Sequence, residues 1–520
     1  MGHVIGIDLG TTYSCIAHLV GEYPRVIPNF DGSPTTPSMV AFTSAGETLI
    51  GTLAMRQAVM NPEKTLFSVK RLIGRKFQSE EMQKAKKLLP YKLAEAPNGD
   101  VLIEIGAQKI TPEEVSALIL GYLKKCAESY FGEEVQDAII TVPANFGDHQ
   151  RHATKDAALL AGLNVLRVIN EPTAASLAFG LDQKKDGNAA VFDLGGGTFD
   201  ITLLEIHNGV FHVLATNGDS FLGGEDFDQR IIDWLLEEFR REHHLDLSGD
   251  KYACQRIKEA AERAKRELSF TSETEINLPF LAAGDGASKN VKKVLTRSRL
   301  ESLTSDLVEK LFPLVERTLA ESRFKLDEID HVILVGGQTR MPLIRKRVSD
   351  FFRKMPNEEV NPDESVALGA AIQSGILERE LDEIVLLLDV TSQSLGIETE
   401  LDGCERIIEK NTTIPVKRTK AFTTVEDNQR QVRIHVLQGE GLKASENISL
   451  AMFNLLGIMP APAGFPQIDV TFEIDADGLV KVTAKDISTG REQMIAIQPS
   501  SGLSRIQIDS LLQKARSRKA

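Results

Sequence analysis

Short apolar runs that end in glycine-rich turns form the most regular pattern in the first two thirds of the chain. In the clearest case the run from Ala189 to Phe192 ends at Asp193, residues 195–197 are glycine, Thr198 follows, and a second apolar run covers residues 201–206. This order predicts a buried strand, a tight turn and a second strand. Because glycine has no Cβ, the N–H groups of such a turn can approach an anion closely. Asp193 repels a phosphate but can hold one through a hydrated divalent cation, so the stretch indicates a metal–phosphate site.

The same order of residues recurs at the N-terminus. An apolar run at residues 4–7 leads into Asp8, a glycine and two threonines, and another apolar run follows at residues 15–20. One such motif alone is more simply a glycine hairpin with a solvated aspartate, but two copies this far apart predict two similar lobes. Neither copy contains the lysine of a Walker-type phosphate loop, and neither turn leads straight into a helix as a dinucleotide fingerprint does.

Predicted helices separate these strands. Thr111-Pro-Glu-Glu suits a helix start, because threonine is a good N-cap, proline fits the first position and acids fit the first turn. Further helical patterns cover residues 149–162, 173–179, most of 225–270, 299–323 and 362–376. A third glycine pair, at residues 336–337, follows an apolar run and leads into another predicted helix, whose N-terminus could carry part of a nucleotide. Strands that alternate with helices predict an α/β core.

Three groups of polar residues have both a plain and a functional interpretation. Lys70-Arg71 lies between apolar residues and is most simply a surface pair, but a lysine in a cleft near two phosphate loops would neutralise transition-state charge. Glu171 follows a strand end, where α/β folds keep functional groups, or it merely complements the dipole of the helix that it begins. One helix face carries four polar residues at spacings of three or four and is most simply a solvated face with ion pairs: Glu262, Lys265, Arg266 and Ser269.

The pattern changes at residue 381. Residues 384–388 form an apolar run fenced by acids, too short to span a membrane and too apolar for a free linker, so we expect it to dock elsewhere on the chain. Seven short apolar runs then alternate with turn signals, which predicts an all-β sandwich. The runs cover residues 395–398, 406–408, 421–424, 431–437, 448–453, 468–474 and 479–484, with Asp477-Gly478 as a hairpin turn before the last. Ser504 can cap one short helix that reaches about Lys514.

Length, charge and cysteine content narrow the function classes. At 520 residues the chain predicts two to four domains. Its formal charge of −14 argues against nucleic acid as the main partner, because phosphate binding needs clustered lysine and arginine. No apolar run approaches the ~20 residues that span a bilayer, and no leader pattern is present, so we expect a cytoplasmic protein without a membrane partner. Cys15, Cys126, Cys254 and Cys404 have no C-x-x-C spacing, which predicts reduced thiols that pack as small core residues.

Seven motifs in this order closely resemble the heat-shock protein 70 (DnaK-type) molecular chaperones, over essentially all 520 residues. The motifs are Ile7-Asp-Leu-Gly-Thr-Thr12, Val142-Pro143, Asn170-Glu-Pro-Thr-Ala-Ala175, Asp193-Leu-Gly-Gly-Gly-Thr198, Gly223-Gly-Glu-Asp-Phe-Asp228, Val335-Gly-Gly-Gln-Thr-Arg-Met-Pro342 and Val385-Leu-Leu-Leu-Asp389. The resemblance implies an α/β, actin-like two-lobed ATPase domain at residues 1–380 and a linker at 381–391. A β-sandwich peptide-binding domain would follow at 392–503, and a short helix at 504–520 would be the remnant of a lid.

By matching position, the resemblance implies that ATP or ADP binds in the cleft between the lobes. The residues that would contact the nucleotide are Gly10, Thr11, Thr12, Tyr13, Gly195, Gly196, Gly197, Thr198, Gly223, Gly224, Glu262, Lys265, Arg266, Ser269, Gly336, Gly337, Arg340 and Asp363. Asp8, Glu171 and Asp193 would position a hydrated Mg²⁺, and Asp200 would hold potassium (K⁺) or the attacking water. The implied catalytic residues are Lys70, Glu171, Thr198 and Asp200. This division of roles agrees with phosphoryl transfer, which depends mostly on positioning and charge neutralisation.

The resemblance also implies coupling and peptide-binding residues. The coupling residues would be Pro143, Arg151, Leu386, Leu387 and Asp389, so the linker would dock on the ATPase domain with ATP and leave it with ADP. The peptide groove, which takes an extended apolar segment, would be lined by Ile397, Glu400, Phe422, Val425, Val432 and Ile434. A J-domain co-chaperone and a nucleotide exchange factor are the implied partners.

Three features depart from the family pattern. Only one short helix stands where the family has a long lid, which predicts faster release of bound peptide. Glu400 replaces an apolar residue that arches over the peptide, which would bias binding toward basic clients or weaken it. Ser392-Gln393 replaces a Pro-Leu pair after the linker.

The leading function is therefore an ATP-dependent chaperone with weak ATPase activity that binds unfolded or extended polypeptides and assists folding in a stress response. A different class stays open, namely an assembly or regulatory adaptor that uses the same ATP switch on one folded partner. A small-molecule kinase on the same scaffold is a third interpretation, which the predicted β-domain disfavours.

Overall fold

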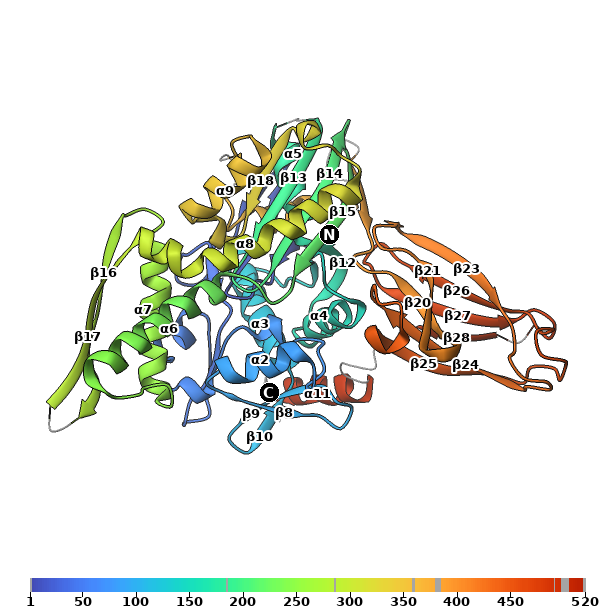
Figure 1. Cartoon of the computed structure of the whole chain (residues 1–520), viewed down its shortest axis with the longest axis horizontal. Coiled ribbons are helices and arrows are strands. Elements are labelled where there is room, and N and C mark those ends of the chain that lie inside the picture. The colour runs from blue at the N-terminus through green and yellow to red at the C-terminus, as the bar shows by residue number, and fades with distance from the viewer. Residues whose placement is uncertain are drawn as a thin grey trace.

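The chain folds into two lobes, each built on a large sheet, with a β-domain that projects to one side of them (Figure 1). The computed structural model describes residues 2–183, 186–284, 287–357, 361–378, 385–490, 492–496 and 505–517. All four cysteines are free; Cys15 and Cys126 are buried as expected, whereas Cys254 and Cys404 are half-buried, so their assignment to the core is wrong. None of the described helices is both long and apolar enough to cross a membrane.

Lobe I is built on a sheet of order β12-β11-β1-β2-β3, with β4 paired to β2. Its strands are β1 (Val4–Asp8), β2 (Tyr13–Val20), β3 (Tyr23–Val26), β4 (Thr35–Pro37), β11 (Asp137–Val142) and β12 (Asn164–Asn170). The first predicted hairpin is confirmed, because β1 pairs antiparallel with β2 and parallel with β11. The helices of this lobe are α3 (Pro112–Phe131), α4 (Asp148–Leu160), α5 (Glu171–Gln183) and α10 (Ser365–Glu378). Thr111 and Glu114 form a reciprocal capping box at the start of α3, as the sequence predicts.

Smaller elements complete lobe I. They are β5 (Val40–Phe42), β6 (Thr48–Ile50), α1 (Thr52–Gln57), β7 (Thr65–Leu66), α2 (Glu80–Leu88), β8 (Lys92–Glu95), β9 (Val101–Ile105) and β10 (Gln108–Ile110). Two short 3₁₀ turns, η1 (Pro62–Lys64) and η2 (Val69–Arg71), flank β7. Because η2 packs against α3, it is held as part of the lobe and not as a free surface loop.

Lobe II is built on a sheet of order β18-β13-β14-β15-β19-β22. Lobe II contributes β13 (Gly187–Leu194), β14 (Phe199–His207), β15 (Val210–Asp219) and β18 (His331–Val335). The linker contributes β19 (Leu386–Val390), and the β-domain contributes β22 (Thr413–Ile414). The central predicted hairpin is confirmed by the antiparallel pairing of β13 with β14. The remaining elements are α6 (Gly224–His243), α7 (Lys251–Glu267), β16 (Glu273–Gly284), β17 (Ala287–Thr296), α8 (Arg297–Ser322), the 3₁₀ turn η4 (Gly337–Arg340) and α9 (Pro342–Phe352).

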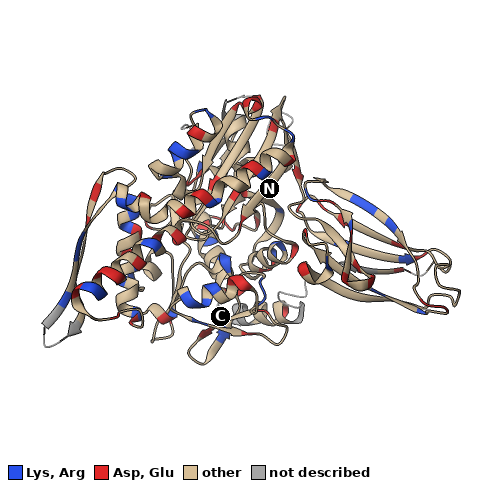
Figure 2. Ribbon diagram, in the orientation of Figure 1, with Lys and Arg blue, Asp and Glu red and all other residues tan. Residues whose placement is uncertain are grey.

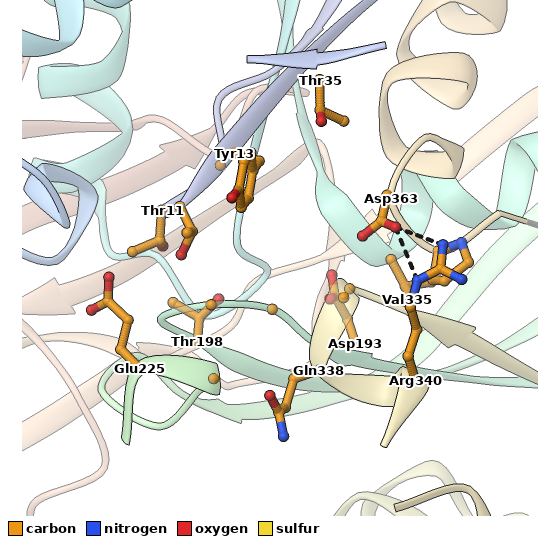
Figure 3. Close-up of a pocket in the computed structure, with 18 of the residues that line it drawn as sticks. Thr11, Tyr13, Thr35, Asp193, Thr198, Glu225, Val335, Gln338, Arg340 and Asp363 are labelled. Atoms are coloured by element: carbon orange, nitrogen blue, oxygen red, sulfur yellow. Dashed lines mark hydrogen bonds and ion pairs between the residues drawn. The ribbon is translucent and has the colours of Figure 1, made fainter. Parts of the chain in front are cut away.

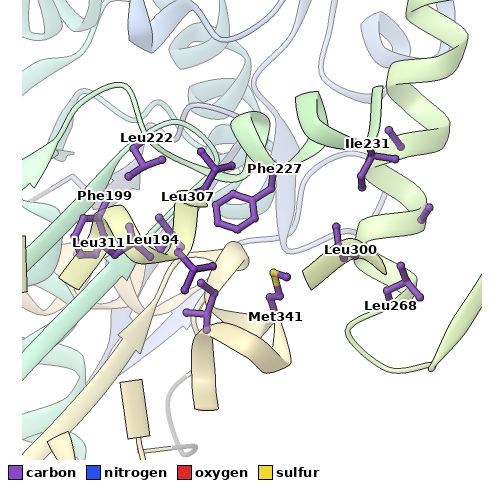
Figure 4. Close-up of a cluster of buried hydrophobic side chains, with 14 of the residues drawn as sticks. Leu194, Phe199, Leu222, Phe227, Ile231, Leu268, Leu300, Leu307, Leu311 and Met341 are labelled. Atoms are coloured by element: carbon purple, nitrogen blue, oxygen red, sulfur yellow. The ribbon is translucent and has the colours of Figure 1, made fainter. Parts of the chain in front are cut away.

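Two apolar cores hold lobe II in place. One joins β13, β14 and β18 to α6, α7 and α8 around Phe199, Phe227 and Leu311, all at most 1% exposed (Figure 4). The other includes Ile139 of lobe I together with Val191 and Ile333 of lobe II. This second core is continuous across both lobes, so the two hairpins are held in one apolar framework.

The β-domain is a sandwich of two four-stranded sheets, of order β21-β20-β24-β25 and β23-β26-β27-β28. Its strands are β20 (Leu395–Thr399), β21 (Gly403–Ile408), β23 (Val416–Phe422), β24 (Gln431–Gln438), β25 (Ile448–Leu456), β26 (Ile468–Ile474), β27 (Val480–Asp486) and β28 (Glu492–Ala496). One apolar core, which contains Leu395, Val436 and Phe472, lies between the sheets. The helix α11 (Arg505–Ser517) then packs against α4 of lobe I, while its predicted cap, Ser504, lies outside the described residues.

Two strand predictions in this domain need correction. The strand expected at residues 421–424 is instead β23, which begins five residues earlier, and β28 was not predicted at all. Residues 417–421 of β23 are exposed, so the strand lacks the alternation that marks a half-buried strand. Figure 2 shows the basic stretch on β23, and charges on such an edge strand discourage pairing with another chain.

Candidate functional site

The turns of the two hairpins touch each other between the lobes. A Cβ on Gly196 would lie 1.9 Å from Thr12 Oγ1, and a Cβ on Gly197 would lie 2.5 Å from Thr11 Cγ2. Only glycine fits at such a distance, so the glycines of the second turn are needed for the close approach. The sequence predicted two similar turns, and the fold places them face to face.

A cavity of about 390 Å³ opens at this contact (Figure 3). It is lined by sixteen of the residues predicted to contact a nucleotide, namely Gly10, Thr11, Thr12, Tyr13, Gly195, Gly196, Thr198, Gly224, Glu262, Lys265, Arg266, Ser269, Gly336, Gly337, Arg340 and Asp363. The predicted metal-positioning residues Asp8, Glu171 and Asp193 also line it, with Lys70. The volume is that of a small-molecule site, and the polar groups come from at least five separate chain segments.

Three predicted residues do not line the cavity. The Gly197 carbonyl instead accepts hydrogen bonds from Arg71 Nε and Nη2, at 3.1 and 3.0 Å. A Cβ on Gly223 would lie 2.6 Å from the Gly196 carbonyl carbon, so Gly223 supports the turn from behind. Asp200 is 1% exposed and lies beneath the cavity floor. Their predicted roles, contact with the nucleotide for Gly197 and Gly223 and binding of potassium or the attacking water for Asp200, stay predictions.

Four carboxylates from four elements converge at the floor of the cavity. They are Asp8 at the end of β1, Glu171 at the start of α5, Asp193 near the end of β13 and Asp200 on β14. Burial, reinforced by repulsion from Glu171, raises the pKa of Asp8 to about 7 and the pKa of Asp200 to about 8. The same two causes raise the pKa of Asp193 well above its usual range. Lys70 is the cation whose charge opposes this trend at all three aspartates.

This cluster suits a hydrated divalent cation. Neither carboxylate oxygen of Asp200 has a hydrogen bond of normal geometry within the described chain, and the nearby amides of Ala144 and Asn145 only partly offset the effect of burial on its pKa. No three His, Cys, Asp or Glu side chains in the described ranges are arranged to bind one metal ion directly. Mg²⁺ commonly keeps several waters and binds through one or two carboxylates plus phosphates. The residues therefore fit a water-mediated Mg²⁺ site completed by phosphate.

Lys70 lies in the cleft and not on the surface. It belongs to η2, is 8% exposed, and its Nζ donates a hydrogen bond to Glu171 Oε1. The plain interpretations of both residues are therefore wrong. Lys70 is not part of a surface pair, and Glu171 accepts a hydrogen bond from Lys70 in addition to beginning α5. The contact joins the 3₁₀ turn beside α3 to the end of β12, two segments a hundred residues apart.

The opposite end of the cavity is formed by α7 and the glycine turn after β18. Lys265 Nζ lies 2.9 Å from Asp228 Oδ1, and burial raises the pKa of Asp228 to about 6 against the effect of that lysine. Arg340 forms an ion pair with Asp363 at 2.6 Å, which Figure 3 shows at the edge of the cavity. The solvated-face interpretation of α7 is wrong for Lys265, whose side chain is 11% exposed, although Arg266 is 65% exposed.

Sequence reasoning missed the role of Arg71. Its Nη2 lies 2.5 Å from Asp226 Oδ2, and Asp226 in turn accepts a hydrogen bond from the Gly223 amide at 2.8 Å. Arg71 thus ties lobe I to both the central turn and the start of α6. The sequence did contain a signal for these two residues, because Arg71 is adjacent to Lys70 and Asp226 lies inside the Gly223–Asp228 motif. Neither motif, however, indicates that Arg71 and Asp226 contact each other.

The linker docks on lobe II, as the sequence predicts. Strand β19 pairs in parallel with Val210–His212 of β15 and antiparallel with Thr413–Ile414 of β22. Leu386 is 48% exposed and Leu387 is half-buried, so the pairing is made mainly by the backbone. Asp389 is buried and its Oδ2 accepts a hydrogen bond from Thr173 Oγ1 at 3.0 Å. One sheet therefore runs from lobe II through the linker into the β-domain.

Arg151 joins the floor of the cleft to the β-domain. Its Nη2 donates to Asn170 Oδ1 at 2.6 Å, next to Glu171, and its Nη1 donates to the Asp477 carbonyl at 3.3 Å. It also bonds the Ala144 and Phe146 carbonyls, which follow Pro143 in the turn after β11. Of the predicted coupling residues, Arg151 thus connects lobe I to the β-domain, Pro143 lies in the turn that Arg151 binds, and Asp389 connects the linker to α5.

The six predicted groove residues lie on the β-domain in two environments. Ile397 and Ile434 are buried in the sandwich core, and Phe422 and Val432 pack against it. Glu400 and Val425 are exposed in the loops after β20 and β23. Their role in peptide binding stays a prediction.

The comparison with protein families matches nearly the whole chain. A family model described as Hsp70 protein matches residues 4–520. The match covers both lobes, the linker strand and the β-domain, so it applies to the complete arrangement described above.

Proposed function

The chain belongs to the Hsp70 family, and we propose that its nucleotide cleft controls how firmly the β-domain holds an extended apolar segment of polypeptide. Proteins of this family are ATP-dependent chaperones and ATPases that bind ATP or ADP with Mg²⁺. They act on unfolded polypeptides together with co-chaperones. For this chain we further propose an actin-like arrangement of the lobes, weak ATPase activity, a J-domain partner, a nucleotide exchange factor and a cytoplasmic location.

The cleft supports a division of roles for ATP hydrolysis. The touching turns at Thr11–Thr12 and Gly195–Gly196 would hold the phosphates, and the α7 face would hold the adenosine. Mg²⁺, when bound, would neutralise phosphate charge, and Asp8, Glu171 and Asp193 would hold it through water. Lys70 would orient Glu171 and place a positive charge beside the transferred phosphoryl group, while Asp200 would hold potassium or the attacking water below it.

One observation carries the proposed switch: the linker strand β19 is paired with lobe II on one side and with the β-domain on the other. Movement of lobe II relative to lobe I would therefore change the position of the β-domain. Arg151 supplies a second connection, from Asn170 beside the cleft to Asp477. Loss of the γ-phosphate would remove contacts between the lobes and shift the population of docked molecules.

The test uses the full chain and a fluorescent apolar peptide. We expect the peptide to bind in ADP and to be released several times faster when Mg·ATP is added. A diverse peptide library of which no member binds would contradict the proposal and favour the adaptor, in which the same switch acts on one folded partner. Hydrolysis that required an added sugar or glycerol would instead favour the small-molecule kinase.

A further inference from the structure

Four residues connect the predicted peptide groove to lobe I through consecutive hydrogen bonds. Glu398 Oε2 lies 2.9 Å from His435 Nδ1, and His435 Nε2 lies 2.7 Å from Ser449 Oγ. The backbone carbonyl of the same Ser449 lies 3.2 Å from Nε2 of His149, on α4. The contacts therefore cross β20, β24 and β25 in order and end on a helix of the other domain.

The two ends of this chain lie beside residues with assigned roles. Glu398 follows Ile397 of the predicted groove, and His435 follows Ile434. At the other end, His149 is two residues before Arg151, which bonds Asn170 beside the cleft. We propose, on the basis of the function proposed above, that His149 is a positioning residue for the docking of the β-domain on lobe I. Glu398, His435 and Ser449 connect this residue to the groove by hydrogen bonds.

The hydrogen-bond roles along the chain are mutually consistent. The Glu398 carboxylate accepts, so His435 Nδ1 carries a proton, and with a neutral ring Nε2 accepts from the Ser449 hydroxyl. A backbone carbonyl can only accept, so His149 donates from Nε2. Ser449 lies at a register shift between β24 and β25, and such bulges redirect backbone groups out of the ladder. The sheet itself thus supplies the acceptor for His149.

Docking in this geometry needs a neutral His149. The residue is 6% exposed, and its Nδ1 is buried with no hydrogen-bond partner in the described structure. A second proton would therefore place an N–H group in the interface without an acceptor, which is costly. Burial lowers the pKa of His149 in agreement with this geometry. Acid is expected to oppose the contact, because undocked His149 gains a proton that the docked form excludes.

Other charged groups face the same region and define the controls. Lys76 and Asp100 of lobe I act on His149 in opposite directions. Asp148, Arg151 and His152 lie on the same helix as His149. The β-domain contributes the Ser449 carbonyl and Gln438. The helix α11, which carries Asp509, packs against α4. Asp148 titrates with the opposite sign, because burial raises its pKa to about 7. Changing His149 alone, with Asp148 kept, isolates the histidine.

The experiment measures docking directly in the full chain. The amides of Val480 and Val168 both donate across the domain interface, to Asp148 Oδ1 at 2.9 Å and to Asp477 Oδ1 at 3.1 Å. Their hydrogen-exchange protection, corrected for the intrinsic pH dependence of exchange, reports docking whether or not peptide is present. The variants are His149→Ala, His149→Gln, His435→Ala, the double His149→Ala/His435→Ala, and the exposed control His207→Gln.

At pH 7.5 we expect His149→Ala to lower the protection of both amides by about three- to tenfold, the value of one hydrogen bond. His149→Gln, which keeps an N–H donor, should restore it, and His207→Gln should match the unmodified chain. The double variant should lose no more than the larger single loss, because both changes interrupt one chain. Between pH 7.5 and 5.5 the parent protein should lose more protection than His149→Gln.

The inference is overturned if His149→Ala protects both amides as well as the parent, if the two single losses add, or if His149→Gln titrates like the parent. Peptide release is measured on the same samples. Absence of ATP-accelerated release in the parent would contradict the proposed function, while the amide protection would still decide the role of His149. Normal release together with unchanged protection would reject only the role of His149.

Discussion

Two buried groups of charge in this protein are balanced in opposite ways. In the cleft, Asp8, Glu171, Asp193 and Asp200 converge around Lys70, and the aspartates have raised pKa values. At the domain interface, Asp477 accepts from Lys155 Nζ at 2.8 Å and from the Val168 amide at 3.1 Å, with Arg167 at 3.8 Å. The cleft has excess negative charge that a cation can relieve, whereas Asp477 at the interface is satisfied by donors of the protein itself.

This difference shows where a switch can draw its free energy. Undocking breaks satisfied contacts, so it needs a contribution from outside the interface. Binding of a cation with a nucleotide stabilises the cleft, whose carboxylates repel one another without it. The cleft is therefore suited to bind the ligand, and the interface is suited to dock or undock in response to that binding.

The largest expected effect comes from removing Lys70, the cation whose charge opposes the raised pKa values of the cleft aspartates. Lys70→Ala should leave ATP binding largely intact and lower the single-turnover hydrolysis rate by about 10²- to 10³-fold, the usual effect of losing one transition-state stabilising group. Thr198→Ala should act in the same direction. The matched control is Lys84→Ala, because Lys84 is exposed and forms an ion pair with Glu80 on its own helix. Unchanged turnover in both cleft variants would show that the site is assigned wrongly.

The next effect is at the interface. Asp477→Ala removes the acceptor shared by Lys155 and the Val168 amide, so docking should weaken by about ten- to a hundredfold, as expected for hydrogen bonds to a charged group. ATP affinity measured by calorimetry should not change. Asp469→Ala is the control, since Asp469 lies on the neighbouring strand β26 and bonds Gln467. Docking is read from the Val480 amide, which donates to Asp148 and not to Asp477, and equal Val480 protection in the two variants would contradict the assigned role of Asp477.

The pH dependence of docking distinguishes Asp477, whose charge is balanced by donors, from Asp148, whose charge is not. Asp148 Oδ1 accepts from Val480, but its Oδ2 is buried without a hydrogen-bond partner in the described chain, and burial raises its pKa from 3.8 to about 7. Between these two pKa values the docked form holds a proton that the undocked form lacks, so the contribution of Asp148 is complete below about pH 4, declines as the pH rises and is lost above about pH 7. Asp148→Asn keeps the acceptor without the charge, so Val168 protection should become higher than in the parent at pH 8. A parent and variant with identical profiles between pH 6 and 8 would refute this.

The smallest effect is expected where charge is exposed. Glu400→Leu should change the ratio of affinities for lysine-flanked and glutamate-flanked apolar peptides by about two- to threefold at low salt, because exposed charges interact weakly and are screened. Fluorescence anisotropy at two salt concentrations measures the ratio. A ratio that does not move, or that moves equally at high salt, would remove Glu400 from the groove rim.

Much of the local structure was predictable because its causes are local. The two hairpins, the capping of α3 and the docking of the apolar linker followed from short patterns of apolar residues, glycine and N-cap residues. The strand β23 was misplaced, because its exposed polar residues carry no alternating pattern. The family motifs named most of the cavity lining, whereas Gly197, Gly223 and Asp200 lie outside that lining and their roles stay predictions.

The sequence by itself determined which residue types were available at each turn, and the tertiary structure decided which of them meet. Lys70 and Glu171 are a hundred residues apart, Arg71 and Asp226 more than that, and His149 meets the Ser449 carbonyl across two domains. A charged or polar residue in a short pattern is compatible with a solvated face or a buried partner. Only packing settles the choice, because burial removes water and makes the identity of the nearest donor or acceptor decisive.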